Sequence, residues 1–487
     1  MELTRERTGQ PRRSRQRDIL SRIVRETEAP TDSLPLVHPD RREPDDDARL
    51  GEVLDLAVSV GAVLMSSGMT TISTVDQVAA IAAAYGVEHC EVDVINTAIH
   101  VAAYRGPTLP PASTIHTVQS RSTDFSRLAA VECLIRRIRA HELSPSEARD
   151  ELDAIITAPH PYKRWIATLA WGALAFSTAG TLGGSLLVCL VSALSTMAID
   201  RINRRLNRTG LPFFFQYVVG GVIATAPPLL LYVLSPRLGL DFEPTVAIAA
   251  GLVVLLAGLS LVSSVGDVIT GAPVTAAGRF FELVMMTAAT IAGVGLVLHL
   301  ANRFGAPFVS IGAYAPAALE ELPIRVAFGA ASAAAFALAC YAERSALLAA
   351  ALGGAAGIMG FMLAQNAGLG VVVASFVAAV PVGLVGRLME RRNLTPPLIV
   401  SISGITPLLP GLALLHGTYA ILNDQLAVGF GAVLGALATG TALAAGVVLG
   451  EWGSWKVHRR RLHARRLRLA RRHLINGDGP ADPQPLL

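Results

Sequence analysis

Residues 166–455 consist almost entirely of Ala, Leu, Val, Ile, Gly and Phe, and charged residues interrupt this stretch only in small groups. An α-helix needs about 20 apolar residues to cross the hydrocarbon core of a bilayer, because it rises about 1.5 Å per residue. The stretch holds many such segments in succession. We therefore expect a polytopic α-helical membrane protein that moves something across a bilayer.

The composition supports this class and argues against others. Hydrophobic residues make up 52% of the 487 residues and charged residues 16%, which is too apolar for a soluble protein of this length. The positive charge is nearly all Arg, and the net charge of +4 lies in segments that flank the membrane, so we expect no nucleic-acid partner. The four cysteines are far apart, with no CxxC and no ligand spacing, so we expect neither a metal nor another cofactor.

The two ends of the chain are polar. Residues 1–48 are rich in Arg, Pro and Asp and are expected to be disordered, with no signal peptide, so the amino terminus is expected to be cytoplasmic. Residues 456–487 form a basic tail with eight arginines, which we expect on the cytoplasmic side against anionic lipid head groups.

A small soluble domain is expected at 49–160, beside the membrane on its cytoplasmic side. Helical periodicity and capping residues predict four helices, at 50–66, 73–85, 125–141 and 144–157. Alternating apolar residues at 92–104 and 113–119 predict a small sheet. The domain is therefore predicted to be α+β.

Ten membrane spans are predicted, at 165–179, 182–200, 213–234, 245–265, 280–301, 322–342, 345–364, 367–388, 397–420 and 426–451. With the amino terminus inside, nine arginines fall in inner loops and three in outer loops, as the positive-inside rule requires. An even number of spans also places the basic tail inside. We expect a multi-pass protein of the plasma membrane with both termini cytoplasmic.

The spans contain an internal repeat at an offset of 153 residues. Pro244 and Gly251 correspond to Pro397 and Gly404, and Gly293 corresponds to Gly446. Two five-span halves, 161–310 and 311–455, must then face opposite ways. An inverted pair of this kind is typical of secondary transporters, in which the halves move around a site near the middle of the membrane.

Breaks in the spans indicate a solute path. Prolines interrupt the ninth span, where backbone carbonyls that lose their partners need a cavity or neighbouring side chains. The candidate path residues are Ser401, Ser403, Thr406, Pro407, Pro410, Gly411 and Tyr419, together with Pro227 and Pro228 as a second break in the first half. The alternative is a structural kink satisfied by neighbouring helices, and the pattern favours neither.

Ionisable residues near the membrane are rare. Asp267 follows the fourth span, and Arg279 and Glu282 open the fifth. Held together at a cytoplasmic vestibule, they would serve proton coupling or recognition of a zwitterion, with Arg279 as the carboxylates' partner or as an anchor for a substrate carboxylate. The alternative is an ion pair at the interface between helix ends.

Several polar residues of the soluble domain raise the hypothesis of a membrane-tethered hydrolase with its active site in 49–160. They are Ser66, Ser67, His89, Asp93, His100, His116 and Arg121. Their spacing matches no nucleophile elbow and no metal motif, which argues against this hypothesis.

The order of parts and several local patterns resemble the threonine/serine exporter family. The matching residues are Ser67-Gly68-Met69-Thr70-Thr71, Val75, Gly86, Val92-Asp93-Val94 and Arg121 in the soluble domain, Gly258, Asp267, Gly271, Gly278, Arg279 and Glu282 in the first half, and Pro397, Pro410, Gly411 and Tyr419 in the second. Ala257-Gly258 stands where the family pattern has Pro-Gly. The resemblance covers about residues 49–455. It implies ten spans, an amino-terminal cytoplasmic domain, and export of small hydroxylated amino acids driven by the proton motive force.

The sequence thus favours a secondary transporter that exports small amino acids such as threonine and serine by alternating access. No Gly-x4-Gly-Lys-Ser/Thr motif is present, which argues against ATP as the driving force. The expected partners are a small amino acid, protons and anionic lipid, and assembly into a homo-oligomer stays an alternative. A passive channel for small solutes and the tethered hydrolase are the competing functions.

Overall fold

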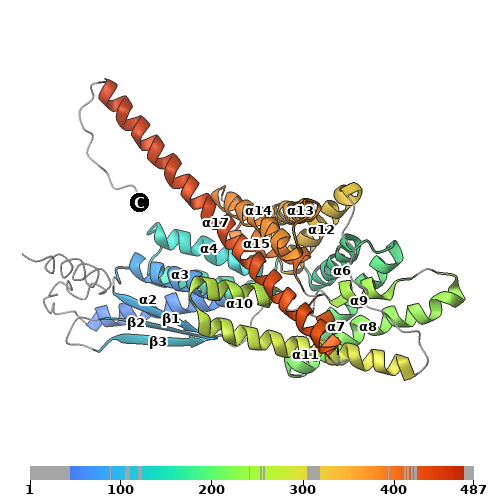
Figure 1. The fold of residues 1–487 in the computed structure, drawn as a ribbon. Helices are drawn as coiled ribbons and strands as arrows, with labels where there is room; N and C mark the ends of the chain where they lie inside the picture. The colour runs from blue at the N-terminus through green and yellow to red at the C-terminus, as the bar shows by residue number, and fades with distance from the viewer. Residues whose placement is uncertain are drawn as a thin grey trace, which may run out of the picture.

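The fold is taken from a computed structural model, which describes residues 44–476 except for 88, 105–109, 119–122, 241, 253–254, 256–257, 304–318, 393, 411–412, 414–415, 418–419 and 422–424. An amino-terminal α+β domain precedes a long helical part (Figure 1). The predictions for residues 1–43, for Arg121, and for Gly411 and Tyr419 lie outside the described residues.

The four helices predicted for the amino-terminal domain are present. They are α2 (Pro44–Ser66), α3 (Thr71–Ala84), α4 (Phe125–Arg139) and α5 (Pro145–Thr157). Helix α2 begins within the segment predicted to be a disordered tail. Gly68, at φ +98°, allows the reversal between α2 and α3. Ser144 and Glu147 form a capping box that starts α5.

The sheet has three antiparallel strands in the order β1 (Cys90–Ile95), β2 (Ala98–Ala103) and β3 (Ala112–Thr117). The stretch predicted as β-rich at 92–104 is a hairpin, because Asn96 adopts φ 53° and turns the chain so that Ile95 pairs with Ala98. On the central strand β2, Ile99, Val101 and Ala103 are buried in the domain core. Helix α2 packs on β2 and β3, and α3 packs on β1.

Within the described residues, the helical part contains eleven α-helices, the last of which is the long carboxyl-terminal helix. They are α6 (Arg164–Thr181), α7 (Leu186–Arg208), α8 (Phe213–Leu238), α9 (Pro244–Leu252), α10 (Gly258–Thr270), α11 (Pro273–Arg303), α12 (Leu322–Ala339), α13 (Arg344–Asn366), α14 (Val371–Arg391), α15 (Pro397–Ile405) and α17 (Leu426–Asn476), with short 3-10 turns η1 (Leu319–Glu321) and η2 (Thr406–Leu408).

Seven of these helices are long and apolar enough to cross a bilayer, which confirms a polytopic helical membrane protein. They are α7, α8, α11, α12 with η1, α13, α14 and the first part of α17. Helix α6 and the interrupted helices α9–α10 and α15–η2 occupy the other three predicted spans. The total of ten spans stays a prediction.

Two helices are interrupted at equivalent positions. Helices α9 and α15 each have nine residues, begin at a proline, and differ by 153 residues at both ends. Helix α9 packs against α6, α7 and α8, and α15 packs against α12, α13 and α14. The neighbours of α9 and α15 therefore correspond in chain order, and the inverted repeat of two five-span halves stays a prediction.

The glycines of the repeat allow close helix crossings in both halves. A Cβ on Gly293 of α11 would overlap the carbonyl of Val218 in α8, and a Cβ on Gly446 of α17 would lie 2.6 Å from the carbonyl oxygen of Phe376 in α14. Contacts this short leave no room for a side chain, so α8 and α11 cross as closely as α14 and α17 do.

The first helices of the two predicted halves run in opposite directions. Arg325, at the start of α12, donates a hydrogen bond of 2.9 Å to the carbonyl of Thr181 at the end of α6. At the other end, the amide of Phe125 in the amino-terminal domain donates to the carbonyl of Cys340, directly after α12. His160, just before α6, lies 3.1 Å from Asp124 of the same domain. Helix α6 therefore begins, and α12 ends, beside the amino-terminal domain.

The predicted break at Pro227 and Pro228 is wrong. Helix α8 continues through both prolines and through Pro236, and Pro381 likewise lies inside α14. A proline removes one hydrogen bond and clashes with the preceding turn, but packed neighbouring helices can hold the helix together across it. In the first predicted half, the interruption lies instead between α9 and α10, where Leu255 is in a turn.

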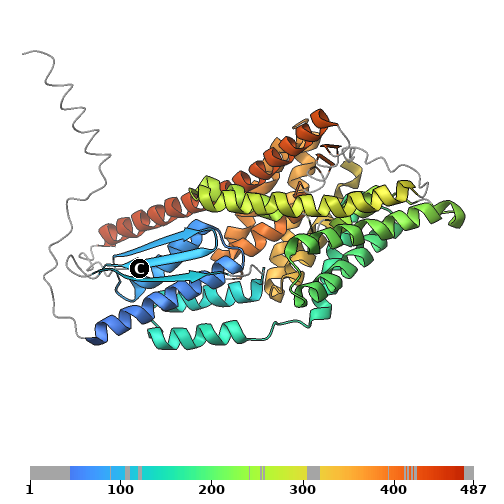
Figure 2. The same ribbon diagram turned by 90° about the horizontal axis from the view of Figure 1, so that it is seen from below.

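The amino-terminal domain and part of the helical region share one hydrophobic core. This shared core joins buried side chains of α2–α5 and β2 with Leu174 of α6, Phe336 of α12, Ala350 of α13 and Ile402 of α15. Figure 2 shows the sheet and its helices lying along one end of the helical part. The domain is thus packed into the molecule.

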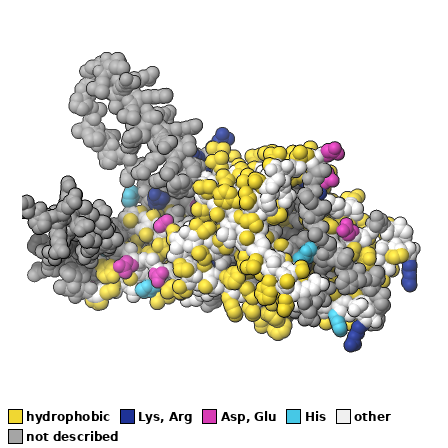
Figure 3. All heavy atoms as spheres, viewed as in Figure 1, with side chains coloured by type: hydrophobic (Ala, Val, Ile, Leu, Met, Phe, Trp, Pro, Cys, Tyr) yellow, Lys and Arg dark blue, Asp and Glu magenta, His cyan; other side chains and the backbone are white. Residues whose placement is uncertain are grey.

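Outside this core the helical surface is apolar. Leu186, Leu348 and Phe281 have exposed fractions of 69%, 73% and 66%. Figure 3 shows hydrophobic side chains gathered over the middle of the helical part, with described charged side chains toward its margins. Helix α17 continues past the predicted span to Asn476 and extends beyond the other helices (Figure 1).

Candidate functional site

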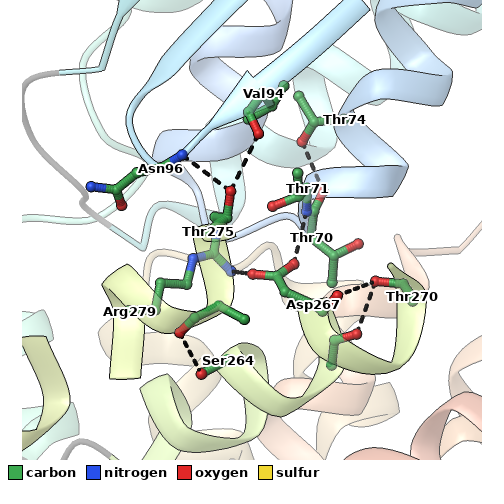
Figure 4. Close-up of polar contacts among 12 residues, drawn as sticks. Thr70, Thr71, Thr74, Val94, Asn96, Ser264, Asp267, Thr270, Thr275 and Arg279 are labelled. Carbon is green, nitrogen blue, oxygen red and sulfur yellow. Dashed lines mark hydrogen bonds and ion pairs between the residues drawn. The ribbon is translucent and has the colours of Figure 1, made fainter. Parts of the chain in front are cut away.

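A buried ion pair lies where the amino-terminal domain meets α10 and α11 (Figure 4). Nη1 of Arg279 on α11 lies 2.6 Å from Oδ2 of Asp267 on α10, and their side chains are 5% and 0% exposed. Gly271, at φ +102°, turns the chain between the two helices so that both residues face each other. The predicted partnership of Asp267 and Arg279 is present in the structure.

The start of helix α3 contacts the same carboxylate. The backbone amide of Thr71, the first residue of α3, donates a hydrogen bond of 3.0 Å to Oδ1 of Asp267. The first amides of a helix have no partner within the helix, and the helix dipole makes this end positive. Asp267 therefore lies between a guanidinium and a helix amino terminus, each of which contacts one of its carboxylate oxygens.

The β1–β2 hairpin makes a second polar contact with α11. The hydroxyl of Thr275 accepts a hydrogen bond of 3.1 Å from the amide of Asn96 and donates one of 3.2 Å to the carbonyl of Val94. One turn further, Gly278 leaves room for the Asn96 side chain, whose Oδ1 would lie 3.2 Å from an added Cβ. We call the contacts of Thr71, Asn96, Asp267, Thr275 and Arg279 the junction.

Glu282 lies outside the junction. It is three residues beyond Arg279 on α11, and its side chain is exposed whereas those of Asp267 and Arg279 are buried. The structure therefore brings together two of the three predicted coupling residues.

The interruption after α15 contains the predicted hydroxyl side chains. Ser403 is 0% exposed, and its Oγ has no hydrogen-bond partner within the described part of the chain. Thr406 is buried and donates a hydrogen bond of 2.9 Å to the carbonyl of Ile402. Pro407 lies in η2 and Pro410 is buried two residues after it ends. Ser403 is therefore a predicted path residue whose buried hydroxyl has no partner among the described residues.

Glu451 was missed by the sequence analysis. Its Oε1 accepts a hydrogen bond of 2.9 Å from Oγ of Ser401, which joins α17 to α15. The hydroxyl of Ser401 is thus already hydrogen-bonded to another residue of the same chain. A lone carboxylate at the end of an apolar span was the signal that would have identified it.

The described polar residues of the hydrolase hypothesis do not form a catalytic arrangement. The hydroxyls of Ser66 and Ser67 both donate to the carbonyl of Val63 in their own helix. Asp93 and His100 are opposite each other on β1 and β2, both exposed, and His89 and His116 are exposed elsewhere. Among the described residues, no group of three or more His, Cys, Asp or Glu side chains is placed to hold a metal ion.

The fold defines the class of a multi-pass helical membrane protein. Comparisons with known proteins give the family. A family model described as "Putative threonine/serine exporter" matches residues 55–301, and one described as "Threonine/Serine exporter, ThrE" matches residues 325–452.

Two curated relatives are similar over most of their length. The "Threonine/serine exporter" of Corynebacterium glutamicum is 41% identical over 417 residues, which is 85% of this chain and 85% of the relative. The "Probable threonine/serine exporter" of Mycobacterium tuberculosis is 35% identical over 413 residues, 84% of this chain and 77% of the relative. No solved structure matches. The chain belongs to the threonine/serine exporter family, and it is a transporter and not an enzyme.

Proposed function

We propose that this protein exports threonine, serine or a similar small amino acid from the cytoplasm by secondary transport coupled to protons. The names of its relatives support the substrate class. The observation that carries the transport mechanism is the pair of interrupted helices, α9 and α15, at equivalent positions of a repeat. Interrupted helices in corresponding halves are typical of substrate sites in secondary transporters.

The solute path is assigned to the break after α15. Ser403, with Thr406, Pro407 and Pro410 beside it, offers a buried hydroxyl and backbone groups that a helix would otherwise use. Gly411 and Tyr419, which follow along the chain, are kept as path residues on the sequence pattern alone. Ser401 contributes by holding Glu451.

The coupling role is assigned to Asp267, with Arg279 as its partner and Glu282 as a second carboxylate further along α11. A buried carboxylate that exchanges a guanidinium partner for a proton changes the charge of the junction by one unit. The amino-terminal domain and the carboxyl-terminal end of α17 are assigned to the cytoplasmic side of the plasma membrane, and the basic tail to anionic lipid head groups.

A flux measurement tests the function. Purified protein in liposomes loaded with labelled threonine is expected to release it faster when a pH gradient is imposed, and the rate is expected to saturate with threonine concentration. A rate that does not saturate would instead support the passive channel, and a rate indifferent to the gradient would reject proton coupling.

Two variants test the assignments. Ser403→Ala is expected to lower the flux about tenfold, the effect of one lost hydrogen bond in a water-poor site. The matched control is Ser177→Ala, since Ser177 is also buried but donates to the carbonyl of Ala173 in its own helix. Asp267→Asn is expected to remove the acceleration by the gradient. If that acceleration persists in folded Asp267→Asn protein, Asp267 is not the coupling residue.

A further inference from the structure

A cavity lies between the amino-terminal domain and the helical part, and none of the junction residues lines it. Its volume is about 420 Å³, and α4 and α5 form one wall. The end of α14 and the residues that lead into α15 form the other. The lining residues with charged or hydroxyl side chains are Glu132, Arg136, Glu151, Glu343, Glu390 and Thr395. The cavity thus lies at the start of one interrupted helix.

The charges of the lining leave an excess of negative charge. Glu151 is paired with Arg137 at 2.6 Å, and Glu390 is paired with Arg387 on its own helix. Among the described residues, Glu132 and Glu343 form no salt bridge, and Arg136 is the cation that lines the cavity with them. When Glu132 is charged, two carboxylates face one guanidinium in this cavity, which leaves room for one further positive charge.

Thr395 gives a second, independent indication of a ligand. Its side chain is 7% exposed, and its Oγ1 has no hydrogen-bond partner among the residues that the structure describes. A buried hydroxyl without a partner costs free energy unless something else satisfies it. Thr395 lines the cavity, so a molecule in the cavity would supply that partner.

The chemistry of the lining selects the kind of ligand. In the described part of the chain no three carboxylate, His or Cys side chains converge as metal ligands would. The volume suits an organic molecule of several heavy atoms better than a bare cation. A primary ammonium group matches both features, because it carries one positive charge and three hydrogen-bond donors.

We propose that this cavity binds the primary ammonium group of a small organic molecule between Glu132 and Glu343, with Thr395 as a hydrogen-bonding partner. The molecule is the amino acid that the protein exports, held beside α15 before it enters the path. The identity of this ligand, though not the ammonium site, rests on the proposed function.

The environment of Glu132 supports the proposal. Burial, with the nearby charge of Glu390 as a second cause, raises the pKa of Glu132 to about 7, and Arg136 and Arg387 limit this rise. The other groups that face the cavity are Glu151 from α5 and Glu343 from the start of α13. A carboxyl with a pKa near 7 is charged mainly above neutral pH, so an ammonium ion is expected to bind more tightly at pH 8 than at pH 6.

Cys133 provides a reporter inside the cavity. It lines the cavity and is exposed, whereas Cys189 and Cys340 are buried. In full-length Cys90→Ser protein, the rate of alkylation of Cys133 is measured with and without L-threonine, putrescine or N-acetyl-L-threonine. Threonine and putrescine are expected to slow alkylation, and N-acetylthreonine, which has no ammonium group, is expected to leave it unchanged.

Variants separate the cavity from the transport path. Glu132→Gln and Thr395→Val are expected to weaken protection about tenfold each, the loss of one charge-assisted or buried hydrogen bond. The control Glu52→Gln removes an exposed carboxylate of α2 and is expected to leave protection intact. Ser403→Ala is expected to reduce transport but not protection.

The outcomes are distinct. Protection by putrescine without protection by threonine would keep the ammonium site and reject the exported amino acid as its ligand. Equal protection by N-acetylthreonine, or full protection in Glu132→Gln, would overturn the site itself. Failure of threonine flux in liposomes would reject the proposed function. The protection by putrescine would still test the ammonium site by itself.

Discussion

At the scale of single residues, the junction depends on one buried carboxylate. Asp267 has both a guanidinium and a helix amino terminus as partners and is 0% exposed. Replacing it by Asn would leave Arg279 buried beside a neutral amide. Removing one partner of a buried ion pair costs about 3–5 kcal/mol. Asp267→Asn is therefore expected to lower the midpoint of thermal unfolding in detergent.

The control for this prediction is Glu282→Gln, on the same helix. Glu282 is exposed, so the change is expected to leave the midpoint nearly unaltered. Equal midpoints for Asp267→Asn and the unmodified protein would show that the pair contributes nothing to stability.

Glu132 gives a pH-dependent prediction. Its folded-state pKa of about 7 lies above the ordinary 4.5, so the folded protein binds more protons than the unfolded chain between these values. The contribution of Glu132 to stability is therefore highest at low pH and is lost as the pH rises toward 7. Glu132→Gln is expected to be more stable than the unmodified protein at pH 8, with the difference shrinking toward pH 5, by thermal unfolding across that range.

The sequence allowed some of these residues to be predicted. Asp267 and Arg279 are rare charged residues in apolar surroundings, and they are close together in the chain. These two features were enough to predict that they are partners. The amide of Thr71 is 196 residues from Asp267, and Asn96 is 179 residues from Thr275. Backbone partners at that separation leave no pattern in a single sequence, because any residue supplies an amide.

At the scale of helices, the close crossing of α8 and α11 at Gly293 leads to a specific prediction. A Cβ on Gly293 would overlap the Val218 carbonyl, so Gly293→Ala is expected to force α8 and α11 apart and destabilise the protein by about 1–3 kcal/mol. Thermal unfolding in detergent measures the loss.

Gly295→Ala on the same helix is the matched control. Nothing lies within 4 Å of a Cβ there, so it is expected to be neutral or slightly stabilising. Equal effects of the two substitutions would contradict the close crossing of α8 and α11.

Hydropathy predicted the positions of the helices well, and proline was a less reliable guide to their breaks. The prolines at 227 and 228 are accommodated within α8, while α9 ends after Leu252 without a nearby proline. Whether a helix continues through a proline depends on which neighbours pack around it. The offset of 153 residues was the better guide, since it transfers the break after Ile405 to Leu252.

At the scale of the whole molecule, the junction can be tested by a cross-link. The Asn96 Cγ, near which the sulfur of a cysteine at this position would lie, is 3.3 Å from a Cβ placed on Gly278. The two positions are therefore close enough for a disulfide. Asn96→Cys with Gly278→Cys, in a background where Cys90 and Cys133 are serine, is expected to form a disulfide on oxidation. If the junction opens during transport, oxidation will stop threonine flux and a reductant will restore it.

Either single-cysteine variant is the control, and its threonine flux is expected to be the same with and without oxidant. Full flux in the oxidised double variant would show that the β1–β2 hairpin and α11 stay together throughout the cycle.

The amino-terminal domain is held by two different kinds of contact. Toward α6, α12, α13 and α15 it shares hydrocarbon side chains in one core. Toward α10 and α11 it relies on hydrogen bonds to Asp267 and Thr275. Water molecules can replace the hydrogen bonds to α10 and α11 at a low cost in free energy, but they cannot replace the hydrocarbon contacts of the shared core. If these two groups of helices shift against each other during transport, the domain is expected to move with the first group and to slide over the second. A binder inserted under the β1–β2 hairpin is then expected to stop transport without contacting the proposed solute path.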